Sequence, residues 1–220
     1  MRLRTVCAAL AALSLTACTT PPRPVVPAAP VTGSSAALAA SIAAAAQRSD
    51  HEPDARIRSQ LADAALHDAD ACVQREPGSG ACLYGRGIAL GLQAKAHPAR
   101  AITFLGDMLD SLARAEAADA NYDEAGPARV QALVLIRAPG WPVGPGDPER
   151  GLAAAQRAVT LRPAYPPNWL ALAEAQAKLG ATDDARASYA RARDAAGSLP
   201  EGSLRAEWQQ AAERGLSHPP

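Results

Sequence analysis

Aromatic residues are scarce in this sequence of 220 residues, where they make up 4% of the chain although 48% is hydrophobic. Alanine therefore supplies much of the apolar content. Sheet cores are usually built from β-branched and aromatic side chains, so the composition argues against a β-sandwich. Alanine is the strongest helix former, and its small side chain lets neighbouring helices approach closely. We therefore predict an all-α fold.

The sequence also lacks an excess of charge of either sign. It holds 22 basic and 22 acidic residues, which gives a formal net charge of zero. A protein that binds the phosphate backbone of nucleic acid needs a strongly basic face. We therefore expect no nucleic-acid partner.

Motifs of familiar catalytic and metal sites are missing as well. There is no G-x-S-x-G, no Walker loop and no H-E-x-x-H, and the four histidines do not pair at metal-binding spacing. The glycines between 138 and 148 are interrupted by prolines, which lack the N–H donors of a phosphate cradle. A pair of carboxylates acting as acid and base is the catalytic arrangement that stays open. We predict no catalytic residue, no metal and no cofactor, and hence a protein that is not an enzyme.

The N-terminus has the features of an export signal. Two arginines precede a short apolar run, so residues 1–17 are predicted to be a signal peptide. Leu15-Thr16-Ala17-Cys18 resembles the lipobox of bacterial lipoproteins. That resemblance implies that Cys18 is lipidated and that the chain is cut before it. Thr19 stands where an aspartate would retain such a protein at the inner membrane, which implies the periplasmic face of the outer membrane. The alternative is an ordinary signal peptide that contains Cys18 by chance.

Residues 18–34 are predicted to be the lipidated cysteine and a proline-rich linker. Its prolines favour an extended chain and oppose a packed core. It would act as a spacer between the membrane anchor and a folded domain at 35–216.

Two cysteines, Cys72 and Cys82, remain in the exported chain beyond Cys18. They flank the turn E-P-G-S-G between two helical patterns, so the antiparallel helices that it joins should touch near them. Export permits a disulfide, and closing so short a loop would stabilise the fold by about 3 kcal/mol. The alternative is a pair of buried free thiols that pack as small apolar side chains.

The segment 167–195 carries a helix-pair pattern. A first apolar stripe ends at Gly180, and Asp183 and Asp184 open a second helix, where acidic residues favour the N-terminus. The pattern resembles the tetratricopeptide repeat, and the matching positions are Trp169, Leu172, Ala185, Tyr189 and Ala192. The resemblance is incomplete, because Gln176 replaces an aromatic residue and Gly197 a proline.

The second-helix signature recurs upstream. Its last position falls at Pro77, Ala120 and Pro163, which are 43 residues apart, and then at Gly197 after 34 residues. The standard period is 34, so the middle units should carry extra residues between their helices, near 95–100 and 138–148. We predict a right-handed solenoid of antiparallel helix pairs. Helices are expected at 35–48, 53–75, 81–95, 98–118, 126–137, 148–161, 167–179 and 182–195, with a capping helix at 204–214.

A narrower resemblance covers about half of the chain. The segments G-P-A-R-V-Q-A-L at 126–133, A-P-G-W-P-V-G-P-G-D-P-E-R-G-L at 138–152 and Y-P-P-N-W-L-A-L-A-E at 165–174 look like the T component of periplasmic TRAP transporters. That resemblance implies a periplasmic protein partner, the solute-binding protein of the transporter. The alternative is a scaffold lipoprotein for envelope, pilus or outer-membrane assembly.

A binding role directs attention to the first helix of each pair, which lines the concave face of such a solenoid. By repeat position, the residues expected on this face are Tyr84, Ile88, Gln131, Leu170, Glu174 and Lys178. Trp141 stands apart in the 138–148 loop. It either plugs the end of the helix stack as core or contacts a ligand or partner, since aromatic anchors dominate interfaces.

We expect Cys18 to carry lipid in the exported protein. Replacing it with alanine removes the acceptor sulfur, so the Cys18→Ala protein should be lost from the outer-membrane fraction. Membrane flotation followed by immunoblotting measures this. An alanine variant that still floats with outer-membrane vesicles would contradict the lipoprotein hypothesis.

Overall fold

The computed structural model describes residues 34–217 of the chain. The predicted signal peptide, Cys18 and the linker up to residue 33 lie outside these residues. Within 34–217, no helix is both long and apolar enough to cross a membrane.

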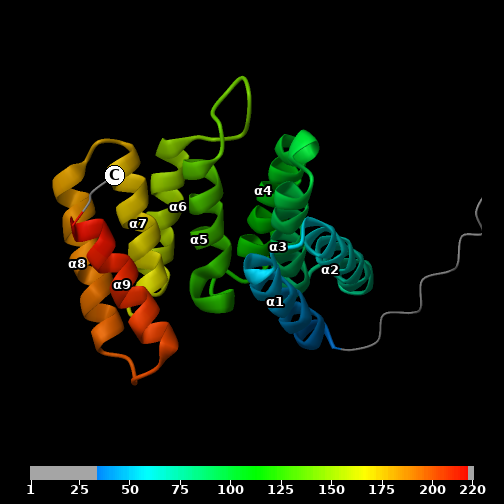
Figure 1. Ribbon diagram of the computed structural model, residues 1–220, viewed down its shortest axis with the longest axis horizontal. Helices are drawn as coiled ribbons and strands as arrows, with labels where there is room; N and C mark the ends of the chain where they lie inside the picture. The colour runs from blue at the N-terminus through cyan, green and yellow to red at the C-terminus, as the bar shows by residue number, and fades with distance from the viewer. Residues whose placement is uncertain (1–33, 218–220) are drawn as a thin grey trace, which may run out of the picture. The chain divides into compact units, whose positions relative to one another are not determined.

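The described residues fold into nine α-helices without a β-strand (Figure 1). Consecutive helices pack in pairs, α1 with α2, α3 with α4, α5 with α6 and α7 with α8, and α9 covers α8. The predicted all-α fold of helix pairs with a C-terminal capping helix is confirmed. The helices are α1 Ser35–His51, α2 Ala55–Arg75, α3 Gly80–Ala96, α4 Ala101–Ala118, α5 Tyr122–Arg137, α6 Pro148–Leu161, α7 Pro166–Lys178, α8 Thr182–Gly197 and α9 Ser203–Ser217.

Alanines fill the contacts between these helices. Those that are fully buried include Ala62, Ala69, Ala89, Ala115, Ala132, Ala155, Ala173 and Ala185. Because a methyl group occupies little space, the helix backbones come close together. The same closeness explains the small number of aromatic residues, since adding even one methylene to such a contact strains the packing by about 1–3 kcal/mol.

Side-chain caps fix where several helices begin. Asp54 accepts a hydrogen bond from the backbone N–H of Arg56 at 2.8 Å, so α2 begins at Ala55 rather than at the expected residue 53. Such a cap typically stabilises a helix by about 1 kcal/mol. The other helices that begin at a side-chain cap are α1 at Ser34, α3 at Ser79 and α6 at Asp147.

The two long repeats accommodate their extra residues differently, one in a loop and the other in longer helices. Between α5 and α6 they form the predicted loop, residues 138–147. Between α3 and α4 there is only a short 3-10 turn, Pro98–Arg100. Here the expectation of a long connection is wrong, because the helices themselves are extended. α3 and α4 have 17 and 18 residues, against 13 and 16 for α7 and α8.

A left-handed turn opens α5. Asp123, Glu124 and Ala125 have φ values of 48°, 55° and 63°, and the right-handed helix follows from Gly126. This conformation costs about 1–2 kcal/mol per residue for an L-amino acid. Three such residues in succession therefore need contacts that hold them.

The Arg129 guanidinium provides several of these stabilising contacts. Its Nη1 donates to the carbonyl oxygens of Asp123 and Glu124 at 3.1 and 3.0 Å, and its Nη2 donates to the Asp123 carboxylate at 2.8 Å. Arg129 is only 8% exposed. The guanidinium also lies 5.0 Å from the ring centre of Tyr165, a cation–π contact. The Tyr84 hydroxyl donates to the same carboxylate oxygen of Asp123, Oδ2, at 2.7 Å.

Asn168, which is fully buried in α7, completes the network. Its Oδ1 accepts from Arg129 at 3.2 Å, and its Nδ2 lies within hydrogen-bond distance of three carbonyl oxygens. These belong to Glu124 at 3.1 Å, Ala158 at 3.2 Å and Arg162 at 3.0 Å. One amide therefore joins the start of α5 to the end of α6 and to α7. The network fixes the direction in which α5 leaves the turn.

Cys72 and Cys82 stand at the end of α2 and the start of α3. In the structure their Sγ atoms are joined at 2.08 Å, both side chains are fully buried, and Leu38 of α1 packs against them. The bridge connects the first two helix pairs at their turn.

We predict the same bridge in the exported protein. Tryptic cleavage after Arg75 separates the two cysteines into the peptides 59–75 and 76–86. Mass spectrometry of a non-reduced digest should therefore detect these peptides as one linked species that reduction splits. Two thiols open to alkylation before reduction would contradict the prediction.

We expect Asn168→Ala to destabilise the protein by about 2–3 kcal/mol, because the change removes the hydrogen bonds of a fully buried amide and leaves a cavity in its place. The midpoint of urea unfolding, followed by circular dichroism, measures this. Asn121→Ala is the matched control, since Asn121 is exposed and makes no side-chain cap at the start of α5. Equal midpoints for the two variants would show that the network does not stabilise the turn.

Candidate functional site

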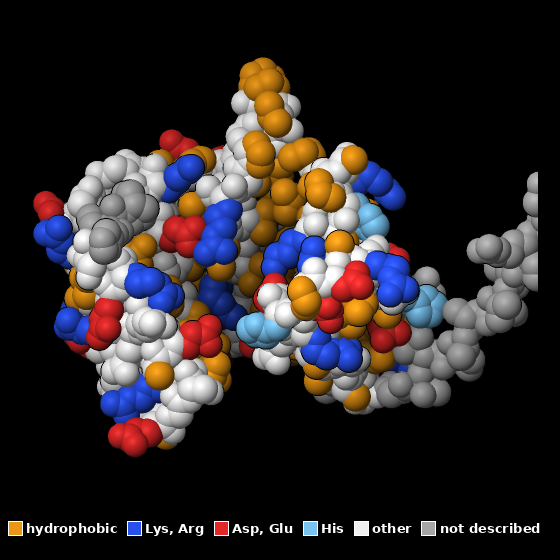
Figure 2. All heavy atoms as spheres, viewed as in Figure 1, with side chains coloured by type: hydrophobic (Ala, Val, Ile, Leu, Met, Phe, Trp, Pro, Cys, Tyr) orange, Lys and Arg blue, Asp and Glu red, His pale blue; other side chains and the backbone are white. Residues whose placement is uncertain are grey.

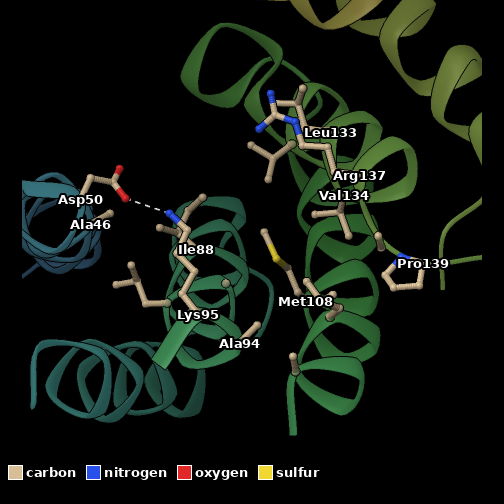
Figure 3. Close-up of a pocket in the computed structure, with 16 residues that line it drawn as sticks. Ala46, Asp50, Ile88, Ala94, Lys95, Met108, Leu133, Val134, Arg137 and Pro139 are labelled. Atoms are coloured by element: carbon tan, nitrogen blue, oxygen red, sulfur yellow. Dashed lines mark hydrogen bonds and ion pairs between the residues drawn. The ribbon is translucent and has the colours of Figure 1, made fainter. Parts of the chain in front are cut away.

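An apolar groove of about 520 Å³ lies between α3 and α5. These two helices approach each other much less closely than α1 and α3 or α5 and α7 do. Hydrophobic side chains gather in the hollow beneath the projecting 138–147 loop (Figure 2), and Figure 3 shows how the lining side chains converge. The principal lining residues are Ile88, Leu92, Leu105, Met108, Leu133 and Val134.

The groove belongs to one end of the helix stack. Its lining comes from the last turns of α1, α3 and α5 and from the first turns of α4. Ala138 and Pro139, at the base of the 138–147 loop, complete the lining. The groove and the loop therefore lie at the same end of the stack, where the first helices finish.

Charged side chains at the groove are paired with one another. Lys95 Nζ contacts Asp50 Oδ1 at 2.8 Å, the pair that Figure 3 marks. Arg137 donates to both oxygens of Glu174, at 2.6 and 2.7 Å. The hydrogen bond to Glu174 raises the pKa of Arg137. Both cations thus have an acidic partner, and the lining between them is predominantly apolar.

A second hollow, of about 300 Å³, continues from the groove toward the left-handed turn. The two share Ala46 and Ile88. Its far end is formed by Tyr84 and Tyr122, whose rings meet edge to face at 5.4 Å, and by Asp123. Burial raises the pKa of Tyr84 and the Asp123 carboxylate adds to the effect, so the phenol stays protonated and donates to Asp123.

The residues expected on the concave face fall into two groups. Ile88 lies in the groove, Tyr84 lies in the second hollow, and Glu174 pairs with the groove residue Arg137. By contrast, Leu170 packs against the α7–α8 core, and Lys178 is exposed in the last turn of α7. The structure brings the first three toward one surface but leaves the last two apart from it.

Contrary to the prediction, Gln131 does not face the concave side. It is buried, and its Nε2 donates to Glu116 Oε2 at 2.7 Å and contacts the Pro127 carbonyl at 3.3 Å. Glu116 also accepts from Arg157 Nε at 2.8 Å. Burial alone would raise the pKa of Glu116, but the hydrogen bonds from Arg157 and Gln131 lower it overall. Gln131 therefore faces α4 and α6, where it holds helices together.

Trp141 is 90% exposed at the tip of the 138–147 loop. The alternative that it plugs the stack as core is therefore wrong. The loop stands away from the helix ends instead of folding over them (Figure 1). The alternative of a contact with a ligand or partner remains a prediction.

Sequence reasoning missed most of the groove. Leu133, Val134 and Met108 line it, and none of them was among the residues expected on the concave face. One signal was available, since the run V-Q-A-L-V-L-I at 130–136 places apolar residues on more than one face of α5. A helix in a simple pair needs only one apolar stripe, so the excess indicates a second apolar surface.

The arrangement offers little for catalysis. Within residues 34–217 no three histidine, cysteine, aspartate or glutamate side chains gather as a metal site would require. Ser59 Oγ lies 3.5 Å from His97 Nε2, and Asp63 Oδ1 lies 3.8 Å from that same nitrogen. A triad needs the carboxylate on the other ring nitrogen, so this cluster does not activate Ser59 as a nucleophile.

Comparisons with known proteins concern the fold. No family model and no curated protein sequence matches the chain. Among solved structures, the chain resembles the crystal structure of a thermophilic TPR protein of Thermus thermophilus. The TM-score is 0.53 at 22% identity, over 79% of this chain and 90% of that chain. The likeness and the consecutive helix pairs together establish a tetratricopeptide-like fold.

Proposed function

We propose that the chain is a non-enzymatic binding module whose groove between α3 and α5 takes an apolar segment of a protein partner. The observation that carries this proposal is the groove itself, about 520 Å³ in volume and lined mainly by aliphatic side chains. Its volume lies within the range of about 300–1,000 Å³ found for binding pockets.

The chemistry of the groove favours a segment with an apolar face and polar flanks. Aliphatic side chains from four helices would surround the apolar anchor, and burying it gives about 25 cal/mol for each Å² removed from water. The two ion pairs, Lys95 with Asp50 and Arg137 with Glu174, would meet the polar flanks of the segment. Because each pair offers both signs of charge, the groove sides accept a polar segment without a net charge.

The proposed setting is the periplasmic face of the outer membrane, with lipidated Cys18 as the anchor. The lipobox-like sequence and the proline-rich spacer support it. The proposed partner is the solute-binding protein of a TRAP-type transporter. Two of the three segments that carry the resemblance to the T component, 126–133 and 138–152, contribute residues to the groove lining. The proposal therefore assigns the resemblance and the groove to the same surface.

A scaffold for envelope, pilus or outer-membrane assembly is the second candidate. It uses the same groove and the same anchor but a different partner, and the tetratricopeptide-like fold favours it equally. The two candidates are separated by which protein loses binding when the groove is altered.

We expect Leu133→Glu to weaken binding of the purified solute-binding protein by tenfold or more, which corresponds to about 1.4 kcal/mol. The change places a charge in the apolar groove, and Leu133 is half-buried and lies outside the main core clusters. Titration calorimetry gives the Kd. Leu204→Glu is the matched control, because Leu204 is 57% exposed and lies far from the groove lining in sequence and in contacts.

Circular dichroism and the urea midpoint check that both variants fold. Equal affinity of Leu133→Glu and Leu204→Glu for the solute-binding protein would reject the groove as the docking site. If the solute-binding protein does not bind, while assembly proteins from the solubilised envelope bind the native chain and not Leu133→Glu, the scaffold candidate replaces the transporter one.

A further inference from the structure

The 138–147 loop carries an apolar tip away from the helix core. Trp141 is 90% exposed and Val143 is 66% exposed, with Pro142 exposed between them. No charged residue occurs from 138 to 146. The loop projects beyond the ends of α5 and α6 in Figure 1, and its end is hydrophobic in Figure 2. Exposed apolar surface of this kind usually marks a contact site.

The base of the loop is held closed. The backbone N–H of Gly146 donates to the Pro139 carbonyl at 2.8 Å, and that of Asp147 donates to the Leu135 carbonyl at 2.8 Å. A Cβ at Gly146 would collide with the carbonyl oxygen of Ala138, so only glycine allows the two sides of the loop to approach this closely. Trp141 is therefore exposed at the end of a loop whose base is fixed by hydrogen bonds.

The apolar groove opens at the foot of this loop. Ala138 and Pro139 belong both to the loop base and to the groove lining, and Ile102, 41% exposed, lies beside Gly144. One chain thus carries an exposed apolar tip and an open apolar groove next to each other. The closed base keeps the tip out of the groove of its own chain.

We propose that the groove also takes the tip, Trp141–Val143, of a second copy of this chain. In a two-fold arrangement each copy would insert its tip into the groove of the other, because tip and groove lie at the same end of the helix stack. Such an interface is self-complementary and closes without further association. The groove, at about 520 Å³, has room for the indole and the neighbouring valine.

The position of the groove favours a second copy over a lipid surface. Ala138 and Pro139, at the loop base, are part of the groove lining, so tip and groove lie at the same end of the stack. Two copies that meet at this end cover both apolar surfaces at once, whereas a bilayer that takes up the tip leaves the groove open.

Occupation of the groove by the tip would exclude a partner segment. In this respect the inference rests on the proposed function, and self-association would set the concentration at which the groove is open to a partner. Self-association itself needs no partner and can be measured alone.

The first measurement is sedimentation equilibrium of the full chain carrying Cys18→Ala, across a wide range of protein concentration. We expect a monomer–dimer equilibrium, and Trp141→Ser should weaken it by tenfold or more. Leu204→Ser, an exposed leucine at another site, should leave it unchanged. A protein that stays monomeric at all concentrations overturns the proposal, as does an equal effect of the two serine variants.

The second measurement tests the geometry by mixing two variants, each of which carries one added cysteine. Trp141→Cys mixed with Leu133→Cys should form a disulfide-linked heterodimer on a non-reducing gel, whereas Trp141→Cys mixed with Leu204→Cys should not. Equal linking in both mixtures overturns the proposal. So does a monomeric chain whose tryptophan fluorescence shifts with phosphatidylethanolamine and phosphatidylglycerol vesicles while that of Trp141→Ser does not, which would assign the tip to a bilayer. In each of these cases the binding test with Leu133→Glu still decides the proposed function by itself.

Discussion

The buried guanidinium of Arg129 determines where α5 can go. It neutralises the Asp123 carboxylate and binds the carbonyl groups of a turn whose left-handed backbone is otherwise unfavourable, and Asn168 Oδ1 accepts a hydrogen bond from it. α5 then forms one wall of the groove, borders the second hollow and supports the projecting loop. Each surface to which a role has been assigned therefore includes α5. A change in the direction of this helix would alter all of them at once.

Much of the fold was predictable because local rules govern it. Apolar spacing marks the helices, Gly180 and the prolines mark their ends, and the alanines indicate close packing. The side chains of the site were less predictable, because their direction depends on how helices far apart in sequence are set against one another. Gln131 shows this, since its repeat position predicted the concave face, whereas in the structure it faces Glu116, which also binds Arg157.

Polar residues inside alanine-rich helices were an overlooked signal of the buried hydrogen-bond network. Arg129 and Asn168 occur in segments otherwise suited to packing, and a buried charge or amide requires partners. Those partners lie in the left-handed turn and at the end of α6, and no sequence pattern predicts that turn. Trp141 was ambiguous for a related reason, because the closed base of its loop depends on close contact across Gly146. Tyr165, at the start of α7, instead packs edge to face against Trp208 of α9.

The network around Asn168 also bears on how the molecule loses its structure. Solenoids commonly unfold from their ends, because each unit contacts only its neighbours and the units melt in sequence. Here one amide joins α5, α6 and α7, and the Tyr84 hydroxyl extends the same set of hydrogen bonds to α3. Three successive helix pairs thus share one set of connected polar contacts. We expect Arg129 and Asn168 together to make unfolding cooperative across these pairs, and hence to resist partial opening by proteases.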